Sequence, residues 1–203
     1  MNNKTETQVD SLEVRKLKGL IRRRESYAAT RYIGLKDANI HFLDMPFYET
    51  GQVKKNPIGI EDIEIVKDII AKIKPHQVFA AGDLADPHGT HKVCLEVVFE
   101  SMRRLKAAGD AWVKDCWVWL YKGAWQEWDI SEIEMAVPMS PDQVMKKRFG
   151  IFIHQSQKDM VPFQGTDSRE FWQRAEDRNA NTANLYAALG MTKYAAMEAF
   201  VRW

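Results

Sequence analysis

The sequence has few cysteines and no long apolar run. Its 203 residues include only Cys94 and Cys116, whose spacing fits neither a zinc knuckle nor a redox pair. A disulfide scaffold is therefore excluded, and two thiols suit a reducing cytoplasm. No apolar run approaches the roughly 20 residues that a membrane span requires, and the amino terminus lacks the apolar region of a secretory signal. We therefore expect a cytoplasmic protein with no membrane partner.

An excess of charge of either sign is also absent. The chain has 29 basic and 28 acidic residues, which gives a net charge of +1. This balance provides no electrostatic argument for a nucleic-acid partner. An apolar content of 45% is typical of a globular protein, and a chain of this length forms one buried core. We expect one domain, 17–203, after a polar leader or linker, 1–16.

Apolar side chains recur at helical and strand spacings along most of the chain. The patterns predict helices over 11–33, 60–73, 87–107, 141–153 and 168–189, and strands over 39–43, 77–81, 116–121, 133–137 and 198–203. Strands separated by helix-length crossovers are typical of the α/β class, with a mainly parallel sheet and helices on both faces. In such sheets, ligands bind beyond the carboxyl ends of the strands.

The segment from Ala81 to His91 has the highest density of side chains that can carry chemistry. It follows a predicted strand, and Asp86 has the position of an N-cap for the helix that comes next. His88 and His91 would then share one helix face, where imidazoles suit a zinc ion or a substrate group. Five histidines in a chain of this length give a three-residue spacing by chance in roughly one chain in ten, so a purely structural pair is the alternative.

Other polar or aromatic residues lie at the ends of predicted elements. Asp44 has the position to contact a histidine or a sugar hydroxyl, or else to cap a turn. Arg24 and Arg31 belong to a basic cluster that suits a phosphate or carboxylate, or else forms a solvated helix face. Trp125 is placed to pack on a sugar ring or to form a lid or subunit contact. His154 follows the end of a predicted helix. Its side chain is placed either to point into the expected site or to interact with the helix dipole.

Four motifs occur in a fixed order along the chain. They are Arg24-Glu25 with Ala28, Ala29 and Gly34; Asn39 to Asp44; Pro87-His88-Gly89-Thr90-His91; and Lys147 to Gln157, which ends in His-x-Ser-Gln. Together they resemble the LmbE/PIG-L family of zinc-dependent N-deacetylases. The resemblance implies a Rossmann-like three-layer αβα fold. It also implies a zinc-bound water that attacks the N-acetyl carbonyl of an amino sugar.

The resemblance assigns residue roles within the expected site. His91 corresponds to a metal ligand, and His88 corresponds to the histidine that stabilises the oxyanion or donates a proton. We group Asp86 and Asp44 with His88 as candidate catalytic residues. Candidate substrate-binding residues are Arg24, Arg31, Trp125 and His154.

Two longer segments, IHFLDMPFYETG and AGDLADPHGTH, are similar to those of one subgroup of the family. In that subgroup an LmbE-like domain follows a glucosamine-6-phosphate deaminase (NagB-like) domain. The family's other two zinc ligands and its general base come from a His-Pro-Asp-Asp segment. The sequence contains no such segment, and the first βαβ unit of the family would precede Ser11. We therefore expect the carboxyl-terminal portion of a larger deacetylase, inactive alone.

We expect the partner of that portion to be an amino-terminal segment of the family domain or a NagB-like deaminase domain, with a homo-oligomer as a further arrangement. Two alternatives remain open. In one, this chain alone holds a metal with a smaller set of ligands, namely His88 and His91 with Asp83 or His154. In the other, the chain is a non-catalytic accessory or assembly module of a glucosamine-6-phosphate deaminase.

Overall fold

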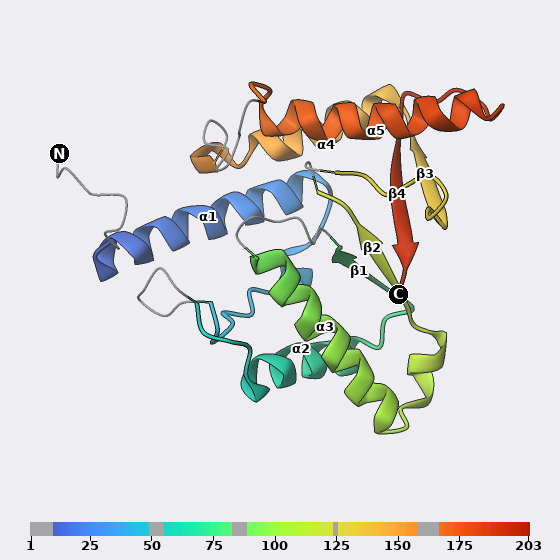
Figure 1. Cartoon of the computed structure of the whole chain (residues 1–203). Helices are drawn as coiled ribbons and strands as arrows, with labels where there is room; N and C mark the ends of the chain where they lie inside the picture. The colour runs from blue at the N-terminus through green and yellow to red at the C-terminus, as the bar shows by residue number, and fades with distance from the viewer. Residues whose placement is uncertain (1–9, 49–54, 83–88, 124–125, 158–166) are drawn as a thin grey trace.

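A computed structural model describes residues 10–48, 55–82, 89–123, 126–157 and 167–203 (Figure 1). The helices are α1 (Leu12–Tyr32), α2 (Ile60–Ile73), α3 (Thr90–Ala107), α4 (Pro141–Phe152) and α5 (Phe171–Ala188). The strands are β1 (Gln77–Ala81), β2 (Trp117–Tyr121), β3 (Met135–Met139) and β4 (Ala196–Arg202), and short 3₁₀ turns include η1 (Asp37–Asn39) and η3 (Gln155–Gln157). The predicted α/β class is confirmed.

The four strands form one sheet in the order β1-β2-β4-β3. β1 and β2 are parallel, with Gln77 opposite Trp117, whereas β4 is antiparallel to both β2 and β3. The sheet is therefore mixed in its pairing rather than mainly parallel, although three strands share one direction. The difference arises because the predicted pattern could not show that β4 enters between β2 and β3.

Helices cover both faces of the sheet. Figure 1 shows α2 and α3 on one side and α4 and α5 on the other. The core beneath α2 and α3 joins Ile63 and Val66 of α2 to Val97 and Leu105 of α3 and to Val118 of β2. Burial of such side chains contributes about 1.5–3 kcal/mol each. This arrangement agrees with the three layers that the sequence resemblance implies.

Polar contacts fix where two helices begin. Asp62 is buried in the first turn of α2, where its carboxylate accepts the N–H of Gly59 at 2.8 Å and that of Phe47 at 3.0 Å. Ser140 caps α4 together with Gln143, as the Ser-Pro start predicts. None of the described helices combines the length and apolarity needed to cross a membrane.

The prediction of a strand over 39–43 is wrong. Asp37 to Asn39 form the turn η1, and the segment after it pairs with no strand in the described part of the chain. Its apolar side chains pack individually instead. Phe42 lies edge-on to Tyr27 with ring centroids 5.1 Å apart, and Leu43 packs against the α2–α3 core. A five-residue apolar run is a strand only where a neighbour completes its ladder.

Further boundaries differ from the prediction: β4 begins at Ala196 rather than at 198, and α5 begins at Phe171 rather than at 168. β3 begins at Met135 rather than at 133, because Asp129 accepts hydrogen bonds from the N–H and hydroxyl of Ser131 and extends the preceding turn. α3 begins at Thr90 rather than at 87, after Gly89 in a left-handed conformation with φ +67°. Glycine adopts this φ at little cost, so it ends the preceding loop there.

Gly82 extends the β1–β2 ladder, and its lack of a side chain is required by its neighbours. Its N–H donates to the Tyr121 carbonyl at 2.8 Å. A Cβ at this position would lie 2.8 Å from the Leu120 Cβ and 3.0 Å from the Trp128 ring. We predict that Gly82→Ala lowers the free energy of unfolding by about 1–3 kcal/mol, measured by urea denaturation.

Gly19 provides the matched control. It lies within α1, and a Cβ there would meet no atom within 4 Å. Gly19→Ala should therefore raise the free energy of unfolding by about 0.5–1 kcal/mol. Equal effects of the two substitutions would contradict the close approach of Trp128 to Gly82.

Candidate functional site

The amino end of α3 follows β1 after the 83–88 segment and contains His91. This histidine is the second residue of α3 and is exposed. Gly89 has the N-cap position of the described helix, and the N-cap prediction for Asp86 falls outside the described residues. His88, Asp86 and Asp83 lie outside the described residues. Among the residues that are described, no three His, Cys, Asp or Glu side chains are grouped as a metal site requires.

Asp44 lies at the surface and pairs with a cation of α1. Its carboxylate accepts a hydrogen bond from the Arg23 guanidinium, which also lies 4.9 Å from the Phe42 ring centroid. Asp44 has a left-handed φ of +46°, which Asp adopts more readily than most residues. A contact with a histidine was one of the alternatives for Asp44, and its partner among the described residues is Arg23. The ion pair joins this segment to α1 instead.

The two predicted substrate-binding arginines of α1 have different surroundings. Arg24 is exposed. Arg31 forms a two-point ion pair with Asp37, and its Nε donates to the Asp37 Oδ1 at 2.6 Å. The hydrogen bond from Arg31 holds the pKa of the Asp37 carboxyl below its ordinary value. Arg31 therefore already has a carboxylate partner where α1 meets η1. This favours the alternative in which Arg31 belongs to a solvated helix face rather than to a substrate site.

The structure joins two of the motifs recognised in the sequence. Glu25 of α1 accepts hydrogen bonds from the Ser156 N–H at 2.7 Å and the Ser156 hydroxyl at 2.6 Å. Burial acts to raise the pKa of Glu25, but these two hydrogen bonds and the nearby His154 lower it below its ordinary value. The Arg24-Glu25 motif and the His-x-Ser-Gln motif thus form one contact between α1 and η3.

His154 lines a groove between α1 and α4. The groove measures about 530 Å³ and has Ala29, Ile33 and Ile151 among its mainly apolar walls. His154 is half-buried and follows the C-cap of α4, Ile153, beside the Glu25–Ser156 contact. Its assignment to substrate binding stays a prediction. Trp125, the remaining substrate-binding candidate, lies outside the described residues.

A largely buried ionic network connects α4, α5, β4 and the segment after β2. Lys147 of α4 donates to Glu198 of β4 at 2.7 Å. Arg178 of α5 donates to the same carboxylate and, at 2.7 Å, to Glu127. Asn179 accepts a hydrogen bond from Lys147 at 2.7 Å and donates to the Met197 carbonyl at 2.9 Å. The side chain of Arg178 is only 7% exposed.

The charges of this network hold one another in their ionised forms. Burial alone would raise the pKa of the Glu198 carboxyl, but the adjacent Lys147 and Arg178 lower that pKa below its ordinary value. A buried cation between two carboxylates is stable because each charge is paired and hydrogen-bonded. The network therefore fixes the position of Glu127 relative to α5.

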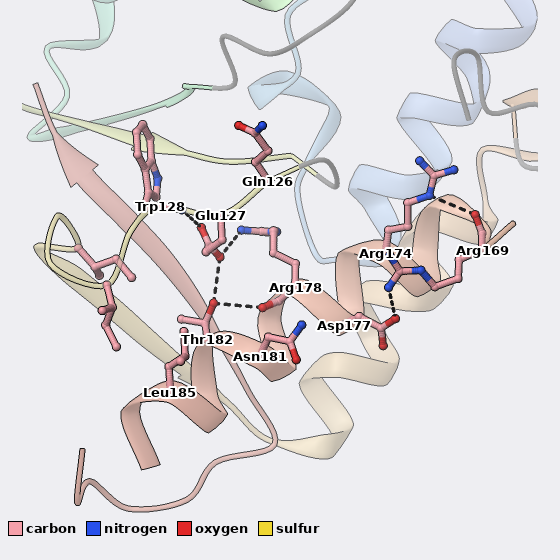
Figure 2. A pocket seen from close by; sticks show the side chains of 12 residues that line it. Gln126, Glu127, Trp128, Arg169, Arg174, Asp177, Arg178, Asn181, Thr182 and Leu185 are labelled. Atoms are coloured by element: carbon pink, nitrogen blue, oxygen red, sulfur yellow. Dashed lines mark hydrogen bonds and ion pairs between the residues drawn. The ribbon is translucent and has the colours of Figure 1, made fainter. Parts of the chain in front are cut away.

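Glu127 forms part of the wall of a second cavity, of about 250 Å³, between α5 and the segment 126–133 (Figure 2). Its carboxylate accepts the Thr182 hydroxyl at 3.1 Å and the Trp128 N–H at 3.0 Å, in addition to Arg178. The Trp128 ring approaches Gly82, and its indole N–H donates to the Leu120 carbonyl at 3.2 Å. The cavity wall is thus tied to the ends of β1 and β2.

Analysis of the sequence missed Arg178, Glu198 and their network. Two signals were present. Arg174, Arg178 and Thr182 recur at four-residue spacing on the α5 face that also carries Ala175, and Glu198 interrupts the apolar strand β4. Charged residues on an otherwise buried face indicate partners inside the fold.

The chain is similar to proteins of two kinds. No family model matches it. A curated glucosamine-6-phosphate deaminase-like protein of Bacteroides thetaiotaomicron is 52% identical to it over all 203 residues, and the chain spans 31% of that protein's length. The rest of that relative is therefore more than twice as long as the region matched here.

Two solved structures share the fold. The N,N'-diacetylchitobiose deacetylase of Pyrococcus horikoshii has a TM-score of 0.58 and 18% identity, with coverage of 98% of this chain and 68% of that one. A deacetylase of teicoplanin biosynthesis has a TM-score of 0.50 and 14% identity, with coverage of 91% and 73%. The chain thus has the fold of these deacetylases and is related to about a third of a glucosamine-6-phosphate deaminase-like protein, which confirms the resemblance found in its sequence.

Proposed function

We propose that this chain is the carboxyl-terminal segment of an amino-sugar N-deacetylase that works with glucosamine-6-phosphate deaminase. Its substrates would be N-acetyl amino sugars in the cytoplasm, and the reaction would be hydrolysis of the amide bond. The observation that supports this most strongly is the fold shared with two deacetylases, together with the position of His91 at the start of the helix that follows β1.

The described residues do not by themselves fit a zinc ion. A catalytic zinc usually has three protein ligands, and His91 is the one described residue that the family resemblance assigns to the metal. When bound, zinc would supply an activated water and polarise the amide carbonyl. We derive no catalytic step from this chain alone. The incomplete set of zinc ligands among the described residues also favours a second candidate function, a non-catalytic accessory module of the deaminase.

The edge of the sheet supports completion by another polypeptide segment. Within the described chain β1 pairs with β2 alone, so its outer edge presents unpaired backbone groups. Phe79 of this strand is 48% exposed, and α1 exposes a stripe that includes Val14, Leu17 and Ile21. Exposed apolar surface is found at interfaces. We propose that a strand from another segment of the larger deacetylase pairs with β1.

Acetate release tests the proposed function. We would compare the chain alone, the chain joined to the rest of the Bacteroides relative, and the joined polypeptide with His91→Ala, using N-acetylglucosamine and its 6-phosphate as substrates. The proposal predicts release by the joined polypeptide and none by the other two. Hydrolysis by the chain alone would contradict the need for completion, and no hydrolysis by the joined polypeptide would favour the accessory function.

A further inference from the structure

The cavity between α5 and the segment 126–133 has the size and lining of a small-ligand site. At about 250 Å³ it is slightly below the roughly 300–1,000 Å³ typical of pockets for drug-sized molecules. Figure 2 shows Glu127, Arg178 and Thr182 at its centre, with Leu185 toward one end and Arg169 and Asp177 toward the other. The proposed hydrolysis assigns no role to the residues that line this cavity.

The three arginines of the cavity wall each have a carboxylate partner: Arg174 lies 3.5 Å from Asp167, and the Nε of Arg178 is the one guanidinium nitrogen among the described lining residues that is buried without a hydrogen bond. Arg178 is paired with both Glu127 and Glu198. Arg169 donates to Asp177 at 2.7 Å and also pairs with Asp167. A charged ligand would therefore have to displace an internal partner and leave that partner's charge unpaired, which is unfavourable in a partly buried site. The lining thus selects against anions such as phosphates, despite its arginines.

The groups that remain for a ligand are neutral and polar. Gln126 and Asn181 are exposed at the cavity, and each amide offers both donors and an acceptor. Ile130 and Leu185 add apolar surface. Hydroxyl groups, which also donate and accept, are complementary to such amides, whereas the C–H faces of a polyol ring suit the apolar side.

The central wall is held in place before any ligand arrives. Three donors fix Glu127. The Thr182 hydroxyl, on a residue that is 2% exposed, shares its one proton between Glu127 and the Arg178 carbonyl, each 3.1 Å away. A wall with fixed side chains loses little conformational entropy when a ligand binds. Weak polar contacts can therefore produce measurable affinity.

We propose that this cavity binds a neutral, hydroxyl-rich molecule about the size of one sugar ring, through the amides of Gln126 and Asn181. The proposal does not require hydrolysis, a metal or completion of the β1 edge. The site is therefore distinct in function from the reaction centre proposed above.

A titration of the chain followed by amide NMR shifts tests this proposal. Glucose should shift signals in 126–133 and 174–185, with a dissociation constant on the order of 1 mM. Asn181→Leu should weaken binding about fivefold or more, because it removes hydrogen bonds worth about 1 kcal/mol. Asn184→Leu is the matched control, since Asn184 is exposed on the same helix outside the cavity lining, and it should leave affinity unchanged.

Glucose 6-phosphate provides the charge test. The proposal predicts that it binds no more than about threefold more tightly than glucose, because the arginines are already paired. Tenfold tighter binding of the phosphate would overturn the proposal, as would an absence of shifts with glucose or equal effects of Asn181→Leu and Asn184→Leu. Because none of these measurements involves acetate release, failure of the proposed deacetylation would leave the result intact.

Discussion

Replacing Arg178 with methionine is expected to lower the free energy of unfolding by about 3–5 kcal/mol, the usual effect of breaking a buried ion pair. The guanidinium lies between Glu127 and Glu198 and is almost fully buried. Methionine would leave Glu127 with the Thr182 and Trp128 donors alone, and Glu198 with Lys147 and Asn179. For a chain of this length the loss corresponds to a fall in Tm of roughly 6–20 °C.

Arg169→Met is the matched control for burial. Arg169 makes ion pairs of similar length with Asp167 and Asp177, but its side chain is 49% exposed. Exposed pairs contribute about 0–1 kcal/mol, so this variant should remain close to the native stability. Urea unfolding followed by circular dichroism measures both. Equal losses for the two variants would contradict the argument that burial of Arg178 determines its contribution.

The same network predicts how stability depends on pH. Because the folded-state pKa of Glu198 is lowered, its contribution is present above the ordinary pKa of the carboxyl and is lost as the pH falls through the folded value. Glu198→Gln should therefore destabilise the protein at pH 7, and its difference from the native chain should narrow in acid. A difference that stays constant with pH would show that the carboxylate charge is not involved.

The second large effect concerns the edge of the sheet. Phe79→Lys should weaken association between this chain and the rest of the Bacteroides relative, supplied as a separate polypeptide, by about tenfold or more. A lysine on β1 would place a charge against the incoming strand, and charged residues on an edge oppose strand pairing. Sedimentation or calorimetry of the two polypeptides gives the dissociation constant.

Val137→Lys is the control at the opposite edge. Val137 lies on β3, the other outer strand, and is 43% exposed, close to the value for Phe79. We expect this substitution to leave the association unchanged. If it weakens binding as much as Phe79→Lys does, or if the native chain does not bind the other polypeptide, then β1 is not the edge that is completed.

Local signals explain which parts of the fold could be predicted from sequence. α2 was located correctly because Ile63, Val66 and Ile70 recur at helical spacing and Pro75 follows the end of the helix. β1 was located for a similar reason, as a short apolar run between turn residues. The segment 39–43 has the same local signal as β1 but lacks a described neighbour, so composition alone could not distinguish the two.

The candidate site depended on contacts between distant residues, which the sequence alone does not show. Arg178 and Glu127 lie 51 residues apart, and an arginine on a helix is read first as a solvated residue. Glu25 and Ser156 belonged to recognised motifs, but their direct hydrogen bonds required the packing of α1 on η3. α3 begins at Thr90 rather than at the predicted residue 87, because Gly89 precedes it in a left-handed conformation. In the sequence, a glycine between two histidines does not indicate clearly where a helix begins.

Zinc stoichiometry tests the central claim, that this chain supplies only part of a deacetylase site, most directly. After equilibrium dialysis, metal analysis should find about one zinc per joined polypeptide, no retained zinc on the chain alone, and loss of the metal from the joined polypeptide with His91→Ala. One zinc held tightly by the chain alone would contradict the claim. A joined polypeptide that binds zinc independently of His91 would contradict it as well.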